Sequence, residues 1–284
     1  MMPQRSLRMR KTVDRAVKAI SALSALAGLG ALVWILYTVV IRGFRSFNLA
    51  FFTQLPTPPG VGGGGLANAI VGTLLITVHA TLIAVPIGIG AGVYLAEFGR
   101  GTKIAKLVQF ITNVLIGVPS IIVGVFIYIL LVVPFHTFSG IAGASSLAVI
   151  MLPVVVRTTE DMLTLVPDQL RESALALGAP HWQVTLKVVF RSAQSGLITG
   201  VLLAVARVSG ETAPLLFTAL NSPYWLHSMK EPLANLTVTI FNYAMSPYTD
   251  WQQKAWGASL LIMFGVLALT ITARLLLRQR GEHQ

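Results

Sequence analysis

Long apolar runs separated by short polar joints fill most of the chain. A transmembrane helix needs about 20 mainly apolar residues, because the hydrocarbon core of a bilayer is about 30 Å thick. Six runs approach or exceed this length: Ala19–Ile41, Ala67–Ala96, Leu107–Val133, Ile141–Val156, Gly196–Leu220 and Ala255–Leu277. The pattern therefore predicts an all-α membrane protein with about six transmembrane helices.

The composition supports this assignment and excludes several classes of protein. Of the 284 residues, 55% are hydrophobic and 11% are charged, whereas a soluble domain has about 25% charged residues. The chain has no cysteine, which excludes disulfides, thiol catalysis and cysteine-bound metals. We expect no metal site, because no histidine–carboxylate cluster has ligand spacing. The sequence also lacks a P-loop, so energy for any transport must come from a partner or an ion gradient.

The basic residues are concentrated in alternate joints. Most of them lie in the N-terminal tail, between the second and third runs, between the fourth and fifth runs, and at the C-terminal end. The other side has only Arg42, Arg45, Lys230 and Lys254. Because cytoplasmic loops are enriched in Lys and Arg, we expect both termini to be cytoplasmic. Residues 1–18 are then a basic cytoplasmic arm and residues 19–45 the first transmembrane helix. This orientation explains the net charge of +11 without nucleic acid.

The joint Asn221–Lys254, expected on the outer face, is rich in aromatic residues. Aromatic rings are enriched at the boundary between membrane and water, so the segment is either an interfacial element or a docking surface for an outside partner. The sequence leaves both interpretations open.

The inner joint between the fourth and fifth runs predicts a compact helical turn. Leu170, Ala174 and Leu177 lie on one helical face, and Pro167 suits the first turn of that helix. Gly178 suits a left-handed position after the helix, and Pro180 can open the next helix. We expect a short amphipathic helix, a turn at Gly178 and a second helix leading into the fifth span. A compact helical projection of this kind on the cytoplasmic face can transmit force to a partner protein.

A charged pair interrupts the fifth run. Arg207 and Glu211 are four residues apart, so on a continuous helix they share one face and can form an ion pair. Each charge costs about 2.5–3.5 kcal/mol at the centre of a spanning helix, so this face should meet protein or an aqueous path. Gly196 and Gly200 lie on the same side and form a helix-packing motif.

Two interpretations of this pair remain open. It is either a structural contact that fixes the orientation of the helix, or Arg207 lies on the path of a translocated anion. A guanidinium presents several donors that match a tetrahedral oxyanion. Glu211 would then hold Arg207 in position and moderate its field, because a pathway must bind weakly enough to release its substrate.

The inner joint resembles the EAA loop of permease subunits of ATP-binding-cassette importers. In Glu172-Ser173-Ala174-Leu175-Ala176-Leu177-Gly178, the residues Glu172, Ala174 and Gly178 match that loop, and Ser173 replaces one small residue by another. The resemblance implies that this segment couples the chain to a cytoplasmic ATPase. It places residues 157–191 in a coupling-helix loop.

Further segments resemble the A-type permeases of phosphate-transport systems, including Tyr94–Gly99, Pro119–Gly124, Arg157–Leu163 and, most clearly, Ala206–Leu216. The resemblance implies a type I ABC importer (MetI-like) permease fold, with five transmembrane helices in a core of residues 66–278, in a bacterial inner membrane. It also implies a C-type permease partner, two ATPase subunits that bind ATP and magnesium, and a periplasmic or lipid-anchored phosphate-binding protein. We expect no cofactor in this chain itself.

Two alternatives to a phosphate importer remain open. Arg207 alone would suit another oxyanion, such as sulfate or molybdate. The chain could also be an ion-coupled secondary transporter, with Glu211 as the proton carrier, although such folds usually show internal repeats and broken helices with more buried titratable groups.

Overall fold

The computed structural model describes residues 7–281, and these residues form helices, turns and loops without a strand. Three of the elements are π-helical and carry the letter η. In chain order the elements are α1 (Leu7–Phe44), α2 (Leu49–Thr53), α3 (Ala67–Val93), η1 (Tyr94–Phe98), α4 (Lys103–Gly117), α5 (Ser120–Ile127), η2 (Tyr128–Val132), α6 (Val133–Phe135), α7 (Gly140–Thr164), α8 (Asp168–Ala176), α9 (His181–Gln183), η3 (Val184–Val189), α10 (Phe190–Val208), α11 (Ala213–Thr218), α12 (Leu236–Ala244) and α13 (Thr249–Gly281).

The prediction of an all-α protein with about six spans is confirmed. Five helices are long and apolar enough to cross a membrane, namely Met9–Phe44, Ala67–Phe98, Gly140–Thr164, His181–Val208 and Thr249–Thr272. A sixth candidate is a bent pair, Lys103–Gly117 and Ser120–Phe135, whose two parts make an angle of 106°.

The predicted third span, Leu107–Val133, is therefore not one continuous helix. The break falls at Val118 and Pro119, which have extended backbone conformations with ψ of 128° and 134°. A residue that precedes proline is sterically pushed out of the helical region, and proline cannot donate a backbone hydrogen bond. The residues on both sides of the break are apolar, so the hydrophobic pattern did not reveal it.

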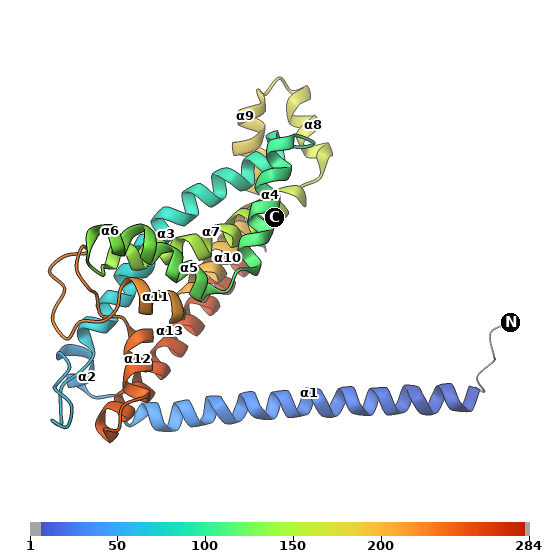
Figure 1. Cartoon of the computed structure of the whole chain (residues 1–284). Helices are drawn as coiled ribbons and strands as arrows, with labels where there is room; N and C mark the ends of the chain where they lie inside the picture. The colour runs from blue at the N-terminus through green and yellow to red at the C-terminus, as the bar shows by residue number, and fades with distance from the viewer. Residues whose placement is uncertain (1–6, 282–284) are drawn as a thin grey trace.

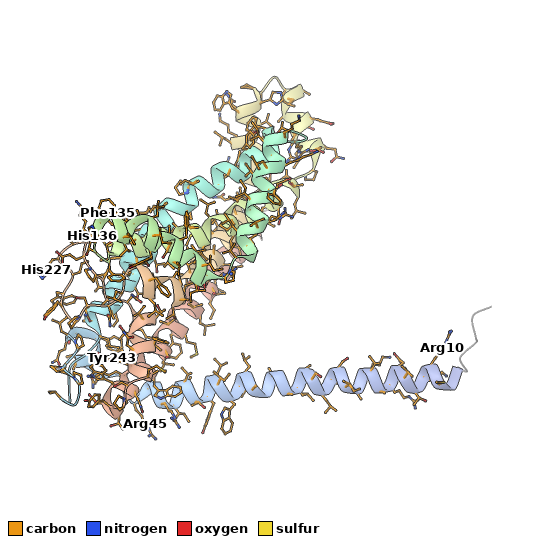
Figure 2. All side chains as sticks on the ribbon, in the orientation of Figure 1. Arg10, Arg45, Phe135, His136, His227 and Tyr243 are labelled. Atoms are coloured by element: carbon orange, nitrogen blue, oxygen red, sulfur yellow. The ribbon has the colours of Figure 1, made fainter. Side chains whose placement is uncertain are left out.

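The expectation of a separate basic arm over residues 1–18 also needs correction. Within the described residues, α1 begins at Leu7, so the basic segment is the first part of one long helix; residues 1–6 lie outside the described part. The helix projects away from the other elements (Figure 1), and Figure 2 shows side chains pointing outward along its length between Arg10 and Arg45. Near its end α1 meets α13, where Gly43 packs against Leu260 and Trp256.

The core lies between α3, α7 and α10, with α11 packed against one end. Ile76, Ala84, Met151 and Val208 are among its fully buried residues. Small residues let the helices approach closely: a Cβ on Gly88 would lie 2.7 Å from a side-chain carbon of Val155. The dense centre is therefore built from the second, fourth and fifth spans.

The predicted joint 157–191 begins later than expected, because Arg157–Thr164 belongs to the last turns of α7. The predicted fifth span, Gly196–Leu220, is likewise displaced. The helical segment begins at His181, α10 ends at Val208, and the short helix α11 follows a break at residues 209–212. Both corrections matter for the site described below.

We expect Gly200→Ala to destabilise the chain, because a Cβ at this position would overlap the Cγ2 methyl of Thr158 on α7. Overpacking of this kind costs about 1–3 kcal/mol. The purified variant should therefore unfold at a lower temperature in detergent. Gly90→Ala is the matched control: it lies in α3 with no neighbouring atom within 4 Å, and alanine favours a helix over glycine by about 1 kcal/mol.

The second substitution Thr158→Ser removes the overlapping methyl group and should restore much of the lost stability of Gly200→Ala. If Gly200→Ala and Gly90→Ala unfold at the same temperature, α10 does not pack against α7 in this way.

Candidate functional site

The segment that follows α7 forms a helical hairpin at one end of the molecule (Figure 1). Pro167 is the N-cap of α8 and Pro180 the N-cap of α9. Between the two helices Gly178 has a φ of +83°, a conformation that residues with a side chain adopt at a cost. Its N–H donates to the carbonyl oxygen of Leu175 over 2.9 Å. The predicted helix, glycine turn and second helix are therefore present.

The residues of the EAA-like sequence are spread over two faces of this hairpin. Glu172 and Ser173 on α8 and Gly178 in the turn are exposed. Ala174 and Leu175 are partly buried and pack against a cluster that includes Leu163 and Val189. The hairpin therefore presents a polar edge outward and packs an apolar edge against the last turn of α7 and against η3.

The tip of the hairpin is apolar and uncovered. Leu177 is 90% exposed, and Trp182 and Leu186 are also exposed. Large apolar side chains left exposed in this way commonly mark a protein or membrane contact when they adjoin one another. An apolar cleft on the surface of a partner protein would cover this tip.

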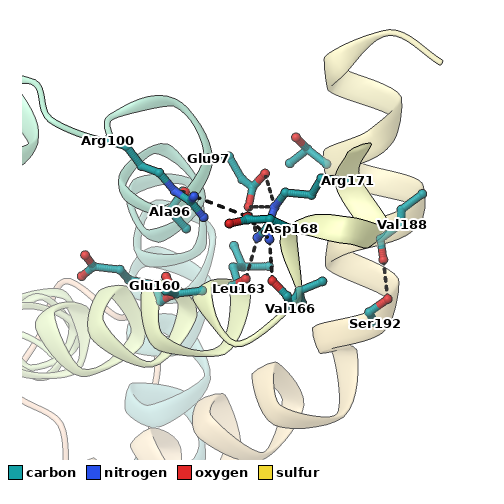
Figure 3. Close-up of polar contacts among 12 residues, drawn as sticks. Ala96, Glu97, Arg100, Glu160, Leu163, Val166, Asp168, Arg171, Val188 and Ser192 are labelled. Atoms are coloured by element: carbon teal, nitrogen blue, oxygen red, sulfur yellow. Dashed lines mark hydrogen bonds and ion pairs between the residues drawn. The ribbon is translucent and has the colours of Figure 1, made fainter. Parts of the chain in front are cut away.

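Arg171 of α8 forms a charged cluster that the sequence did not reveal (Figure 3). Its Nη2 donates to Oε1 of Glu97 over 2.7 Å, and its Nη1 donates to Oδ1 of Asp168 over 3.0 Å. Glu97 has basic neighbours along the chain at Arg100, Lys103 and Lys106, yet it pairs with Arg171, which is 74 residues away. The only signal in the sequence was a lone carboxylate at the apolar end of the second run.

Arg207 lies in the last turn of α10 and is exposed. Its neighbours Ala204 and Val208 pack in the same cluster as Met151, which lies near the middle of α7. Arg207 is therefore at mid-height of the packed spans. An exposed guanidinium at that depth is costly in lipid, so this face must meet a polar surface, either an aqueous path or another subunit.

Glu211 does not share a helix with Arg207, which corrects the predicted pairing. The helix ends at Val208, and the N–H of Glu211 donates to the carbonyl oxygen of Val208 over 3.1 Å in the turn that follows. The carbonyl oxygen of Glu211 accepts a hydrogen bond from Thr237 Oγ1 over 2.9 Å. Among the described residues no ion pair joins Arg207 and Glu211. The i, i+4 rule failed because it assumes an unbroken helix.

The break at residues 209–212, which follows Arg207, leads into α11, and α11 packs against α5. The helix α5 itself follows the break at residues 118–119. The helices α11 and α5 are packed together, and a Cβ on Gly124 would lie 2.6 Å from the backbone of Pro214. Non-helical backbone at membrane depth is tolerated where protein buries it or where it lines a water-filled cavity. The short helices that follow the two breaks, α5 and α11, therefore bury one another's backbone.

Gly196 and Gly200 lie on α10 against α7. A Cβ on Gly196 would overlap the side chain of Met162, and one on Gly200 would overlap Thr158. These close approaches hold α10 against α7. Arg207 lies two turns beyond Gly200 on the same side of α10, and its side chain is exposed there. No group of three His, Cys, Asp or Glu residues in the described part of the chain is arranged to hold a metal ion.

Comparisons with known proteins agree with this architecture. Residues 84–280 match the family described as binding-protein-dependent transport system inner membrane component. The chain is 49% identical to the phosphate transport system permease protein PstA of Yersinia pestis over 88% of its length and 84% of the relative. It is 49% identical to PstA of Haemophilus influenzae over 88% of both chains.

The fold is also similar to a solved structure. A chain of the MetNI methionine ABC transporter superposes with a TM-score of 0.64 and 22% identity, covering 75% of this chain and 95% of that one. The MetI-like fold that the sequence suggested is thus confirmed. The chain belongs to the family of binding-protein-dependent transport system inner membrane components.

Proposed function

We propose that the chain is the transmembrane permease subunit of an ATP-driven importer of inorganic phosphate. The observation that carries the proposal is 49% identity, over 88% of the chain, to permeases named for phosphate transport. The exposed Arg207 at mid-height supports it, because a guanidinium offers a fixed set of donors for a tetrahedral oxyanion. On this view Arg207 belongs to the phosphate path, and Glu211 contributes to the same region from the adjoining turn.

The chain would act with several partners. Two ATPase subunits would bind ATP and magnesium and dock on the hairpin of α8 and α9, where Glu172, Ser173 and Gly178 are exposed. A C-type permease would complete the path opposite Arg207, and a periplasmic or lipid-anchored binding protein would deliver phosphate. Both termini would then lie in the cytoplasm, in agreement with the distribution of Lys and Arg.

The transport cycle would use alternating access. Closure of the ATPase pair on ATP would draw the two hairpins of the paired permeases together and open the path to the outside. Phosphate would enter from the binding protein and meet Arg207. Hydrolysis would return the hairpins to their starting separation and open the path to the cytoplasm.

The substrate is tested in cells that lack this chain and their other phosphate importers. Restoring the chain should restore uptake of radiolabelled phosphate, and excess unlabelled sulfate or molybdate should not compete. Restored uptake of sulfate or molybdate, but not of phosphate, would keep the permease and overturn the substrate. A chain with Arg45→Ala, on the opposite side to the ATPase, should transport as the unchanged chain does.

A further inference from the structure

The helix α8, which would receive force from an ATPase, makes few apolar contacts of its own with the spans. No residue of α8 is fully buried, and only Ala174 and Leu175 pack partly against the cluster beneath them. The connection from α7 to α8 consists of three residues, 165–167. Something else must keep α8 fixed to the membrane-spanning helices if it is to move them.

Arg171 supplies that attachment. Besides its bonds to Glu97 and Asp168, its Nη2 donates to the carbonyl oxygen of Leu163 over 2.8 Å and its Nη1 to that of Val166 over 2.5 Å. One guanidinium therefore joins three elements: α8, the last turn of α7, and η1, the inner end of the second span. Figure 3 shows these bonds converging on Arg171.

The ion pair with Glu97 is protected from water. The side chain of Arg171 is 12% exposed and that of Glu97 is 9% exposed. The hydrogen bond with Glu97 also raises the pKa of Arg171, although burial acts in the opposite direction, so the guanidinium stays charged. Removing one member of such a pair leaves an uncompensated charge. By contrast, the salt bridge between Arg100 and Asp168, at 3.5 Å, is exposed to water. Exposed salt bridges contribute little to stability.

We propose that Arg171 is a positioning residue that fastens the coupling hairpin to the inner ends of both α3 and α7, so that the three move as one body. The inference rests on the proposed function, because it assumes that an ATPase moves the hairpin. The chain continues from the hairpin into α10 covalently, whereas α3 reaches the hairpin only through packing, along α7 and through Val93 and Ala96 in the apolar cluster beneath it. The pair of Glu97 and Arg171 adds a directional, charged link between α8 and the end of the second span.

A distance measurement tests the rigid connection without relying on transport. The chain has no cysteine, so spin labels can be placed at two engineered cysteines, Phe98→Cys in η1 and Gln169→Cys in α8, both at exposed positions. In the complete complex the distance between the labels should be the same without nucleotide and with ATP. After Arg171→Ala, the distribution of distances between the labels should broaden, or its mean should differ between the nucleotide-free and ATP-bound states. A distance that changes with ATP while Arg171 is present would overturn the proposal.

The coupling ratio provides the second test. In the reconstituted complex, Arg171→Ala should lower the phosphate transported per ATP hydrolysed by about tenfold, within the usual range of coupling energies, while ATP hydrolysis continues. Glu97→Ala should have the same effect, and the double variant should be no worse than either single variant, because both remove one link. A residue that only supports folding would instead reduce the amount of complex and leave the ratio unchanged.

Milder variants keep the test decisive if alanine prevents assembly. Arg171→Lys keeps the charge but cannot reach all four acceptors at once, and Glu97→Gln removes the charge but keeps an acceptor; both should lower the ratio. Arg157→Ala is the control, since Arg157 bridges only to Glu160 and Asp161 on its own helix. An unchanged ratio in all the Arg171 and Glu97 variants would overturn the link. If the unchanged complex moves no phosphate at all, the proposed function fails, and the label distances still decide on the rigid connection.

Discussion

Phosphate uptake should fall to background when Arg207 is replaced by alanine, in a complex that assembles in normal amounts. Arg207 is exposed at mid-height of the packed spans, so its removal leaves the core contacts in place. Losing a charged donor to a buried anion costs about 2–5 kcal/mol, which is enough to abolish uptake in practice. The measurement is radiolabelled phosphate uptake, normalised to the amount of complex in the membrane.

Two further variants sharpen this result. Arg207→Lys keeps the positive charge but loses the planar fork of donors, so it should also fail if bidentate contact with phosphate matters. Lys11→Ala removes an exposed positive charge from α1 and should transport normally. Normal uptake by an assembled Arg207→Ala complex would remove Arg207 from the pathway and leave it a role at a subunit contact.

The ATPase should no longer bind stably when Leu177 is replaced by aspartate. Leu177 is 90% exposed at the tip of the hairpin, so the change should not affect folding of the chain. Burying a leucine side chain contributes about 1.5–3 kcal/mol, and a carboxylate in the same cleft adds a desolvation cost. We expect co-purification of the ATPase to be lost, together with ATP-dependent uptake.

Leu49→Asp is the matched control, because Leu49 is a leucine on α2 that is 80% exposed, at the end of the molecule away from the hairpin. That variant should retain the ATPase. Retention of the ATPase by Leu177→Asp would mean that the tip does not enter the partner, and that docking relies on other parts of the hairpin.

The number of spans and the hairpin followed from patterns that act locally. Long apolar runs identify spans because an unpaired backbone is excluded from lipid. Pro167, Gly178 and Pro180 restrict the backbone at their own positions, so the start and end of the short helices could be placed from these residues alone.

The breaks in the third and fifth runs were not predicted, because hydrophobicity does not change across them. Pro119 was the only local signal for the first break. The second follows Val208, where Ser209 and Gly210 precede Glu211, and helical periodicity carried across that point led to the incorrect pairing of Glu211 with Arg207. A spacing rule is valid only within one continuous helix.

The cluster around Arg171 could not be predicted for a different reason. Glu97 and Arg171 are 74 residues apart, and each has charged neighbours along the chain that offer a simpler partner. Only the packing of α3 on α7 brings them together. Predicting such a contact requires knowledge of the tertiary structure. The turn of the EAA-like segment could be predicted without it, because single residues determine the turn.

The most direct test of the account is radiolabelled phosphate uptake into proteoliposomes that contain this chain, its partner permease and the ATPase, with binding protein outside. The account predicts accumulation only when ATP is trapped where the ATPase can use it, and no effect of excess unlabelled sulfate. Uptake that is driven by a proton gradient without ATP would contradict it, and the hairpin of α8 and α9 would then not be a coupling element.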